Sequence, residues 1–136
     1  MLNAPAKKES LLDMPSDQEV ETFIRSTFRS VWALELLILL RENQARALTH
    51  AEMVKRLRGS DLVVQQSVES LAAAGLVIPD SEGSARYNPA SEQLERLTEV
   101  TEQIYARSPD AVRRMIVAAV TPGLAAFADA FKLRKD

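Results

Sequence analysis

The pattern of apolar and polar residues divides the chain into helices joined by short polar connections. Ser16 to Glu19 has the form of a capping box, in which a serine hydroxyl and a glutamate three residues later satisfy backbone amides. Apolar residues then recur every three or four positions from Val20 to Val31. The pattern predicts a helix over residues 16–29 and another over residues 30–42, either separate or continuous.

The next stretch, Val31 to Leu40, is apolar on almost every side and is interrupted only by Glu35. A helix that is apolar all round is typical of the centre of a core. A buried strand is the alternative for such a run, but leucine, alanine and glutamate favour a helix. We expect a central helix with Trp32 and the leucines in the middle of the core.

Two further helices are predicted by their caps and by the glycines that end them. Thr49 to Glu52 is a second capping box and opens a helix over residues 49–58, with Gly59 in the left-handed position at its end. Ser60 or Asp61 caps the following helix, over residues 60–74, which Gly75 ends. Met53, Leu57 and Leu71 are expected to face the core.

Residues 76–88 read as a β-hairpin. Leu76 to Ile78 has the composition of a strand, residues 79–84 form a polar turn, and residues 85–88 can return as the second strand. Tyr87 is expected to pack this hairpin onto the body of the domain.

The rest of the chain flanks this unit. Residues 1–15 are expected to be a disordered tail, and residues 91–136 a helical extension with an apolar stripe from Leu94 to Ala119. Ser91 caps its first helix, and Ser108-Pro109-Asp110 opens the next. The helices over 16–29 and 91–120 either dimerise or complete the protein's own core. Phe127 and Phe131, in a last short helix, either pack on that core or dock onto a partner.

Composition excludes several classes of function. Of 136 residues, 46% are hydrophobic and 26% are charged, the formal net charge is -2 and the pI is about 5.5, so any DNA contact requires a local cationic patch. With no cysteine, one histidine, no glycine-rich phosphate loop and no nucleophile motif, we expect neither catalysis nor a metal or cofactor. The longest apolar stretch is too short to span a membrane, so a cytoplasmic protein is expected.

The order of helix 30–42, helix 49–58, helix 60–74 and hairpin 76–88 is that of a winged helix-turn-helix. The segment from Thr49 to Val77, THAEMVKRLRGSDLVVQQSVESLAAAGLV, resembles the MarR-, PadR- and ArsR-like bacterial transcriptional regulators. The most specific part is Leu71 to Val77, in which a leucine, three residues and Gly-Leu-Val join the third helix to the wing. The predicted fold is mainly α with a small β-hairpin, and the winged-helix domain covers residues 30–90.

The resemblance implies a DNA-binding regulator whose third helix lies in the major groove and whose wing contacts phosphate or the minor groove. The positions that would then face DNA are Ser60, Asp61, Gln65, Gln66, Glu69 and Ser70. Either glutamine could read adenine through a bidentate contact, or both could be ordinary surface residues. Contacts to the DNA backbone would come from Thr49, His50, Lys55, Arg56, Arg58 and, on the wing, Arg86.

Charge argues against this reading. From Ser60 to Ala74 there is no lysine or arginine, and residues 45–90 contain five basic and five acidic residues. DNA affinity depends largely on neutralised phosphates, so a monomer with this balance would bind poorly, whereas a homodimer would double its contacts. A solvated face is the alternative for the basic residues, and an exposed position at a helix start is the alternative for His50. The alternative function is a protein–protein interaction module that binds no DNA.

Overall fold

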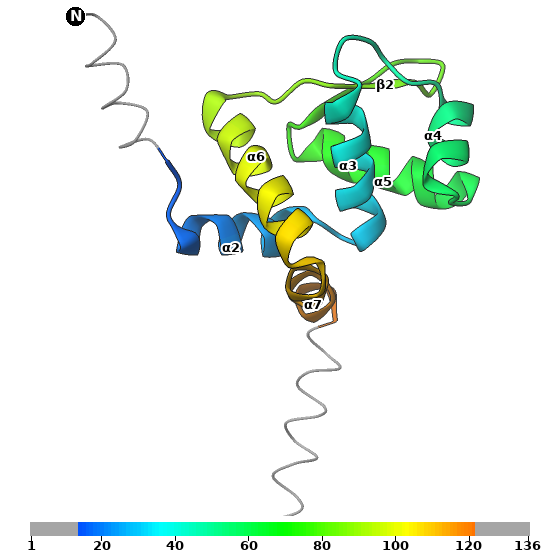
Figure 1. Cartoon of the computed structure of the whole chain (residues 1–136). Coiled ribbons are helices and arrows are strands. Elements are labelled where there is room, and N and C mark those ends of the chain that lie inside the picture. Colours follow the sequence, from blue (N-terminus) through cyan, green and yellow to red (C-terminus); the bar gives the residue numbers. More distant parts are fainter. Residues whose placement is uncertain (1–13, 122–136) are drawn as a thin grey trace, which may run out of the picture.

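In a computed structural model the protein is described for residues 14–121 (Figure 1). This part contains six helices and one hairpin: α2 (Asp17–Thr27), α3 (Val31–Glu42), α4 (His50–Leu57), α5 (Asp61–Ala73), β1 (Val77–Pro79), β2 (Ala85–Tyr87), α6 (Glu92–Arg107) and α7 (Pro109–Val120). The fold is mainly helical, and the hairpin directly follows α5. The order from α3 to β2 is that of a winged helix-turn-helix, with flanking helices on both sides.

The first two helices are separate. Ser16 forms the expected capping box with Glu19 at the start of α2. At its end, Phe28 adopts an extended backbone with φ -95° and ψ 116°, and Ser30 then caps α3 by accepting a hydrogen bond from the Ala33 amide. The chain therefore turns between α2 and α3, although no glycine or proline marks the turn.

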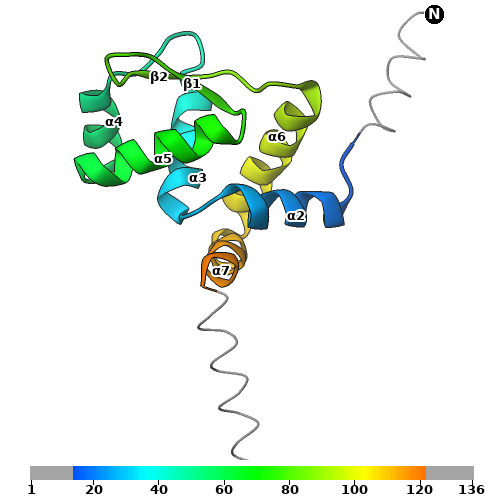
Figure 2. The same ribbon diagram turned by 180° about the vertical axis from the view of Figure 1, so that it is seen from behind.

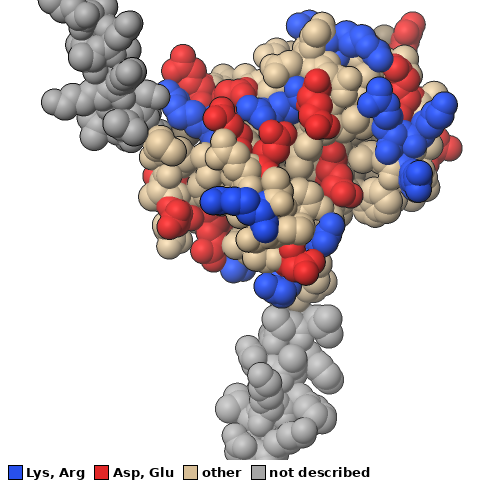
Figure 3. Space-filling model, in the orientation of Figure 1, with Lys and Arg blue, Asp and Glu red and all other residues tan. Residues whose placement is uncertain are grey.

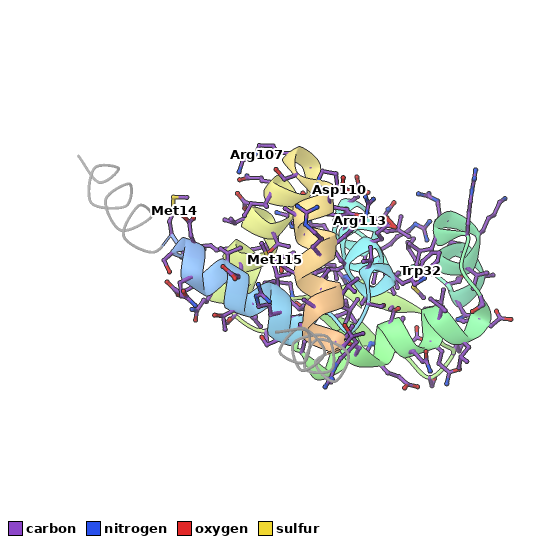
Figure 4. All side chains as sticks on the ribbon, turned by 90° about the horizontal axis from the view of Figure 1, so that it is seen from below. Met14, Trp32, Arg107, Asp110, Arg113 and Met115 are labelled. Atoms are coloured by element: carbon purple, nitrogen blue, oxygen red, sulfur yellow. The ribbon has the colours of Figure 1, made fainter. Side chains whose placement is uncertain are left out.

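Helix α3 lies at the centre of the core, where Leu34, Leu36, Leu37 and Leu40 are at most 1% exposed. The prediction that Trp32 lies in the middle of this core is wrong, because its side chain is 38% exposed. Trp32 lies in the first turn of α3, on the less buried side that it shares with Glu35 and Leu39. Its indole ring packs beside Gly59 in the turn between α4 and α5 (Figure 4).

The hairpin covers one end of the domain through alternate residues. Val77 pairs with Tyr87 and Ile78 with Arg86, so that Val77 and Tyr87 face inward while Ile78 and Arg86 face outward. The first strand extends one residue further than predicted, to Pro79. Leu48 forms an isolated bridge to Ala85 and so joins the connection before α4 to the hairpin. Gly75 has the left-handed backbone, φ 78°, that the junction between α5 and β1 requires.

Helices α2, α6 and α7 form a layer beside the winged helix. Helix α7 packs against both α2 and α6, with Val112 and Ile116 buried (Figures 1 and 2). Pro109 occupies the first turn of α7 as expected, but the Ser108 hydroxyl makes no capping hydrogen bond. Within residues 14–121, no helix is long and apolar enough to cross a membrane. Residues 1–13, Phe127 and Phe131 lie outside the described residues.

Candidate nucleic-acid interface

Helix α5 has one buried face and one open face. Val64, Val68 and Leu71 turn inward, and α5 packs mainly on α3 and also on α4. Figure 2 shows the whole length of α5 on the side of the molecule away from α6. The exposed residues of α5 that were predicted to face DNA are Asp61, Gln65, Gln66 and Glu69, and Ser70 is half-buried. Four of the six predicted positions on or beside α5 therefore share one open surface along the helix.

The two glutamines on this surface differ in their surroundings. The Gln65 side-chain amide donates to Oε1 of Glu69, one turn further along, at 3.2 Å. Gln66 has no hydrogen-bond partner among the described residues and borders a small hollow of about 120 Å³ together with Trp32 and Ser30. Both polar atoms of the Gln66 amide are therefore available to a ligand, while part of Gln65 is engaged within the helix.

The predicted hydroxyl contacts at the helix starts are already used as caps. The Ser60 hydroxyl accepts from the Val63 amide at 3.1 Å, and the Thr49 hydroxyl accepts from the Glu52 amide at 3.1 Å. Glu52 completes the capping box and also binds Arg46, with a closest N–O distance of 2.7 Å. The hydrogen bonds from Arg46 and from the Thr49 amide lower the pKa of Glu52 to about 2. Ser60 and Thr49 could still donate their hydroxyl protons to a phosphate.

His50 connects three parts of the predicted interface. Its Nε2 lies 2.9 Å from Oδ1 of Asp61, which joins the first turn of α4 to the first residue of α5. A Cβ atom added at Gly83, in the turn of the hairpin, would lie 3.6 Å from the His50 Cβ. His50 is therefore half-buried and partnered, and is not simply an exposed residue at a helix start. Its contact with Asp61 also engages one of the two carboxylates of α5.

Lys55, Arg56 and Arg58 form a cationic cluster, here called the α4 cluster. All three side chains are exposed, and none has an ion-pair partner within residues 14–121. Figure 3 shows lysine and arginine gathered on the side of the molecule occupied by α4. Arg56 and Arg58 also border a cleft together with residues of α3 and α6, whereas no residue of α5 borders it. The fold therefore places the α4 cluster to one side of the open surface of α5.

The backbone at the end of α4 differs from the prediction. Arg58, and not Gly59, has the left-handed conformation, with φ 58°. This conformation is unfavourable for a residue with a Cβ atom by about 1–2 kcal/mol. The preference of glycine for such positions suggested Gly59, but the helix ends one residue earlier. The Arg58 side chain borders one hollow together with Lys55 and Arg56.

Arg86 projects from the outer face of β2, opposite Ile78, and has no ion-pair partner in the described part of the chain. The turn of the same hairpin is acidic. Its Asp80 carboxylate accepts hydrogen bonds from the Glu82 and Ser84 amides at 2.9 and 3.0 Å, which fix the turn. The wing thus offers one cation on a strand and two carboxylates at its turn.

Sequence reasoning missed three residues that border the α5 surface. Leu62 on α5 is 60% exposed, Trp32 lies beside Val63 and Gln66, and Arg29 borders a hollow of about 290 Å³ with Ser70 and Ala73. Helical periodicity does not reveal that Trp32 and Leu62 are exposed, since both fit an apolar stripe. Arg29 could have been found from its place in the polar connection directly before α3.

Comparison of the chain with protein-family models, curated proteins and solved structures gives no match in any of the three.

Proposed function

We propose that this protein is a DNA-binding transcriptional regulator that reads duplex DNA with α5 and uses the β1–β2 hairpin as its wing. The observation that carries the proposal is the open face of α5, where Gln66 presents an unengaged amide on the third helix of a winged helix-turn-helix. A side-chain amide of this kind can form two hydrogen bonds with an adenine edge in the major groove.

Phosphate contacts in this proposal come from elements beside α5. A helix in the major groove has a sugar-phosphate backbone on each side of it. Arg29 borders the α5 surface next to Ser70, Arg86 projects from β2, and the α4 cluster lies beyond the other end of the helix-turn-helix. Cations on these flanks compensate for the carboxylates of Asp61 and Glu69. The backbone amides at the N-terminus of α4, near Thr49 and His50, would provide further contacts for phosphate.

The test is selection from a random duplex library at low salt, followed by affinity measurements on the selected sequence. Gln66→Ala should weaken binding and relax the preference at one base pair. Arg86→Ala should weaken all sequences equally and reduce the salt dependence by about one phosphate contact. Gln93→Ala and Arg107→Ala, at exposed positions of α6, are matched controls that should leave binding unchanged. If no sequence is enriched and the weak binding that remains is unaffected by Gln66→Ala and Arg86→Ala, the proposal is wrong.

A second function is favoured by a different observation. Asp61, Glu69, Asp80 and Glu82 give α5 and the hairpin turn four carboxylates, and Trp32 and Leu62 expose apolar surface beside them. Tryptophan and leucine bordered by acids suit a protein partner with an apolar pocket and a basic rim. In affinity capture, recovery of a stoichiometric partner protein that is lost when Leu62 is replaced by alanine supports this function. Recovery of nucleic acid alone argues against it.

The proposal includes a homodimer and, because its target is DNA, a cytoplasmic location. Helix α7 leaves Val117 and Val120 exposed at 51% and 39%, next to the segment that contains Phe127 and Phe131. Two copies joined through this layer would present two α5 helices, and half-sites about 34 Å apart would then be expected. Solution mass by light scattering tests the dimer directly, and a monomeric mass at micromolar concentration would contradict it.

A further inference from the structure

A cleft of about 640 Å³ lies between α3, α4 and α6. Its apolar lining includes Ile38, Leu39 and Leu57, and its polar lining includes Glu35 and Tyr105. This volume is within the range of pockets that bind small molecules. The cleft has no lining residue from α5 or the hairpin, so it is separate from the surface assigned to DNA except where Arg56 and Arg58 border both regions.

The polar residues of the cleft differ in exposure. Glu35 and Tyr105 are half-buried, whereas Glu42, Arg56 and Arg58 are exposed. Glu35 has no ion-pair partner within residues 14–121, and its one hydrogen bond there is a long contact of 3.4 Å from the Tyr105 hydroxyl. Arg113 of α7 reaches that hydroxyl at 3.2 Å without pairing with Glu35. A half-buried carboxylate without a counterion, beside aliphatic side chains and a tyrosine, suits an amine with an apolar body.

A second carboxylate of the cleft belongs to a network that reaches the wing. Glu102 binds the Arg41 guanidinium at 2.7 Å, and Arg41 also pairs with Glu95 at 3.2 Å and with Glu99 at 3.6 Å. The other oxygen of Glu95 accepts a hydrogen bond from the Tyr87 hydroxyl on β2, at 2.7 Å. The Oε2 atom of Glu102 is buried and has no partner in the described residues. Glu102 therefore depends on Arg41 for its stabilisation, and a cation nearby would loosen that pair.

We propose that the cleft is an effector site for an organic monocation with an apolar body, held by Glu35, and that its occupancy changes the hairpin through Arg41. The charged group of the ligand pairs with Glu35, and its body lies on Ile38, Leu39 and Leu57. The ammonium group of the ligand attracts the Glu102 carboxylate and repels Arg41, so Arg41 shifts toward Glu95 and Glu99 and alters the contact with Tyr87. The proposed regulation of DNA binding rests on the function proposed above, but binding in the cleft does not.

The test is a titration of the full ¹⁵N-labelled chain with 2-phenylethylamine in the absence of DNA, so that its outcome is independent of DNA binding. Saturable shifts are expected at the amides of residues 35, 39, 102 and 105, and smaller ones at residues 85–87. Phenylacetate, of similar shape and opposite charge, should give no saturable shift. Glu35→Gln should raise the Kd about fivefold, the size of one partly exposed ion pair. Glu21→Gln, on α2 and paired only with Arg25 among residues 14–121, is the matched control.

Two further variants distinguish loss of the ligand's ion pair from an indirect structural effect of Glu35→Gln. Arg56→Ala removes a repelling charge at the border of the cleft and should tighten amine binding. Tyr87→Phe removes the hydroxyl that contacts Glu95 and should abolish the shifts at residues 85–87, while saturable amine binding at residues 35 and 39 remains. The proposal is overturned by a lack of saturable amine binding, by equal binding of phenylacetate, by a Kd insensitive to Glu35→Gln, or by hairpin shifts that survive Tyr87→Phe.

Discussion

The open face of α5 and the α4 cluster carry complementary parts of what a DNA-binding surface needs. Helix α5 offers amides and carboxylates but no cation, whereas Lys55, Arg56 and Arg58 offer three cations and no amide. The two regions are separated by the turn at Gly59 and belong to different sides of the helix-turn-helix. Under the proposed function, DNA affinity and base specificity would depend on different elements, so a substitution in one region should remove one of them without the other.

The largest expected effect comes from the packing that holds both regions in place. Leu71 is fully buried on the inner face of α5. Leu71→Ala should lower the free energy of unfolding by about 2–5 kcal/mol, because it removes buried methyl groups and leaves a cavity. Urea denaturation followed by circular dichroism measures this change. Ala73→Ser, at an exposed position of the same helix, is the control and should have little effect.

The next largest effect separates the two glutamines of α5. Gln66→Ala should cost about 1–3 kcal/mol of discrimination at one base pair. Gln65→Ala should cost less, because the Gln65 amide already donates to Glu69. Competition binding with single-base variants of a selected site measures both. Equal losses for the two substitutions would show that the hydrogen bond to Glu69 does not reduce the availability of Gln65.

At the N-terminus of α4, Thr49→Ala should destabilise the domain by about 1 kcal/mol, because the Glu52 amide loses the hydroxyl that caps it. Thermal unfolding measures the effect. Thr49→Ser retains the acceptor and should restore most of the stability. If serine and alanine are equally destabilising, the methyl group of Thr49 and not its hydroxyl is responsible.

A smaller effect of opposite sign is expected at the α4 cluster. Arg58→Gly should raise the free energy of unfolding by about 0.5–1 kcal/mol, because glycine accepts the left-handed backbone at φ 58° without strain. The same change removes a cation, so DNA affinity should fall and its salt dependence should decrease by about one contact. Arg56→Gly, within α4, is the contrasting variant and should destabilise the domain. Loss of stability in Arg58→Gly would mean that its side chain holds the turn.

The smallest expected effect is on the stability of the domain at acidic pH. The pKa of Glu52 is lowered to about 2 in the folded protein, below its ordinary value of about 4.5. The group therefore contributes its stabilisation fully above pH 4.5 and loses it as the pH falls from 4.5 toward 2. Glu52→Gln should remove this part of the pH dependence while leaving the rest of the acid transition. Thermal midpoints between pH 2 and pH 7 for the two proteins measure the difference.

Much of the fold could be predicted because local chemistry determines it. The capping boxes at Ser16 and Thr49, the end of α5 just before Gly75 and the inward-facing Tyr87 all follow from nearby residues, and the structure confirms them. Trp32 was misplaced because an apolar run carries no information on which side of a buried helix its neighbours leave open. That side depends on the packing of the α4–α5 turn, which is a tertiary property.

The candidate site was less predictable for the same reason. The outward positions of α5 follow from helical periodicity, but periodicity cannot show that the Gln65 amide is engaged by Glu69 or that His50 reaches Asp61. The separation of Arg56 and Arg58 from the α5 face depends on how α4 crosses α5. Arg41 contacts Glu95 and Glu102, which lie 54 and 61 positions further along the chain, and no local pattern indicates these contacts.

The central claim, that the open face of α5 is the surface that reads DNA, is tested most directly by mapping amide shifts of the labelled protein on a selected duplex. The account predicts the largest shifts at residues 60–70, smaller ones at residues 85–87 and in the α4 cluster, and loss of the residue 66 shift in Gln66→Ala. Shifts confined to the α4 cluster, with residues 60–70 unchanged at saturation, would contradict it.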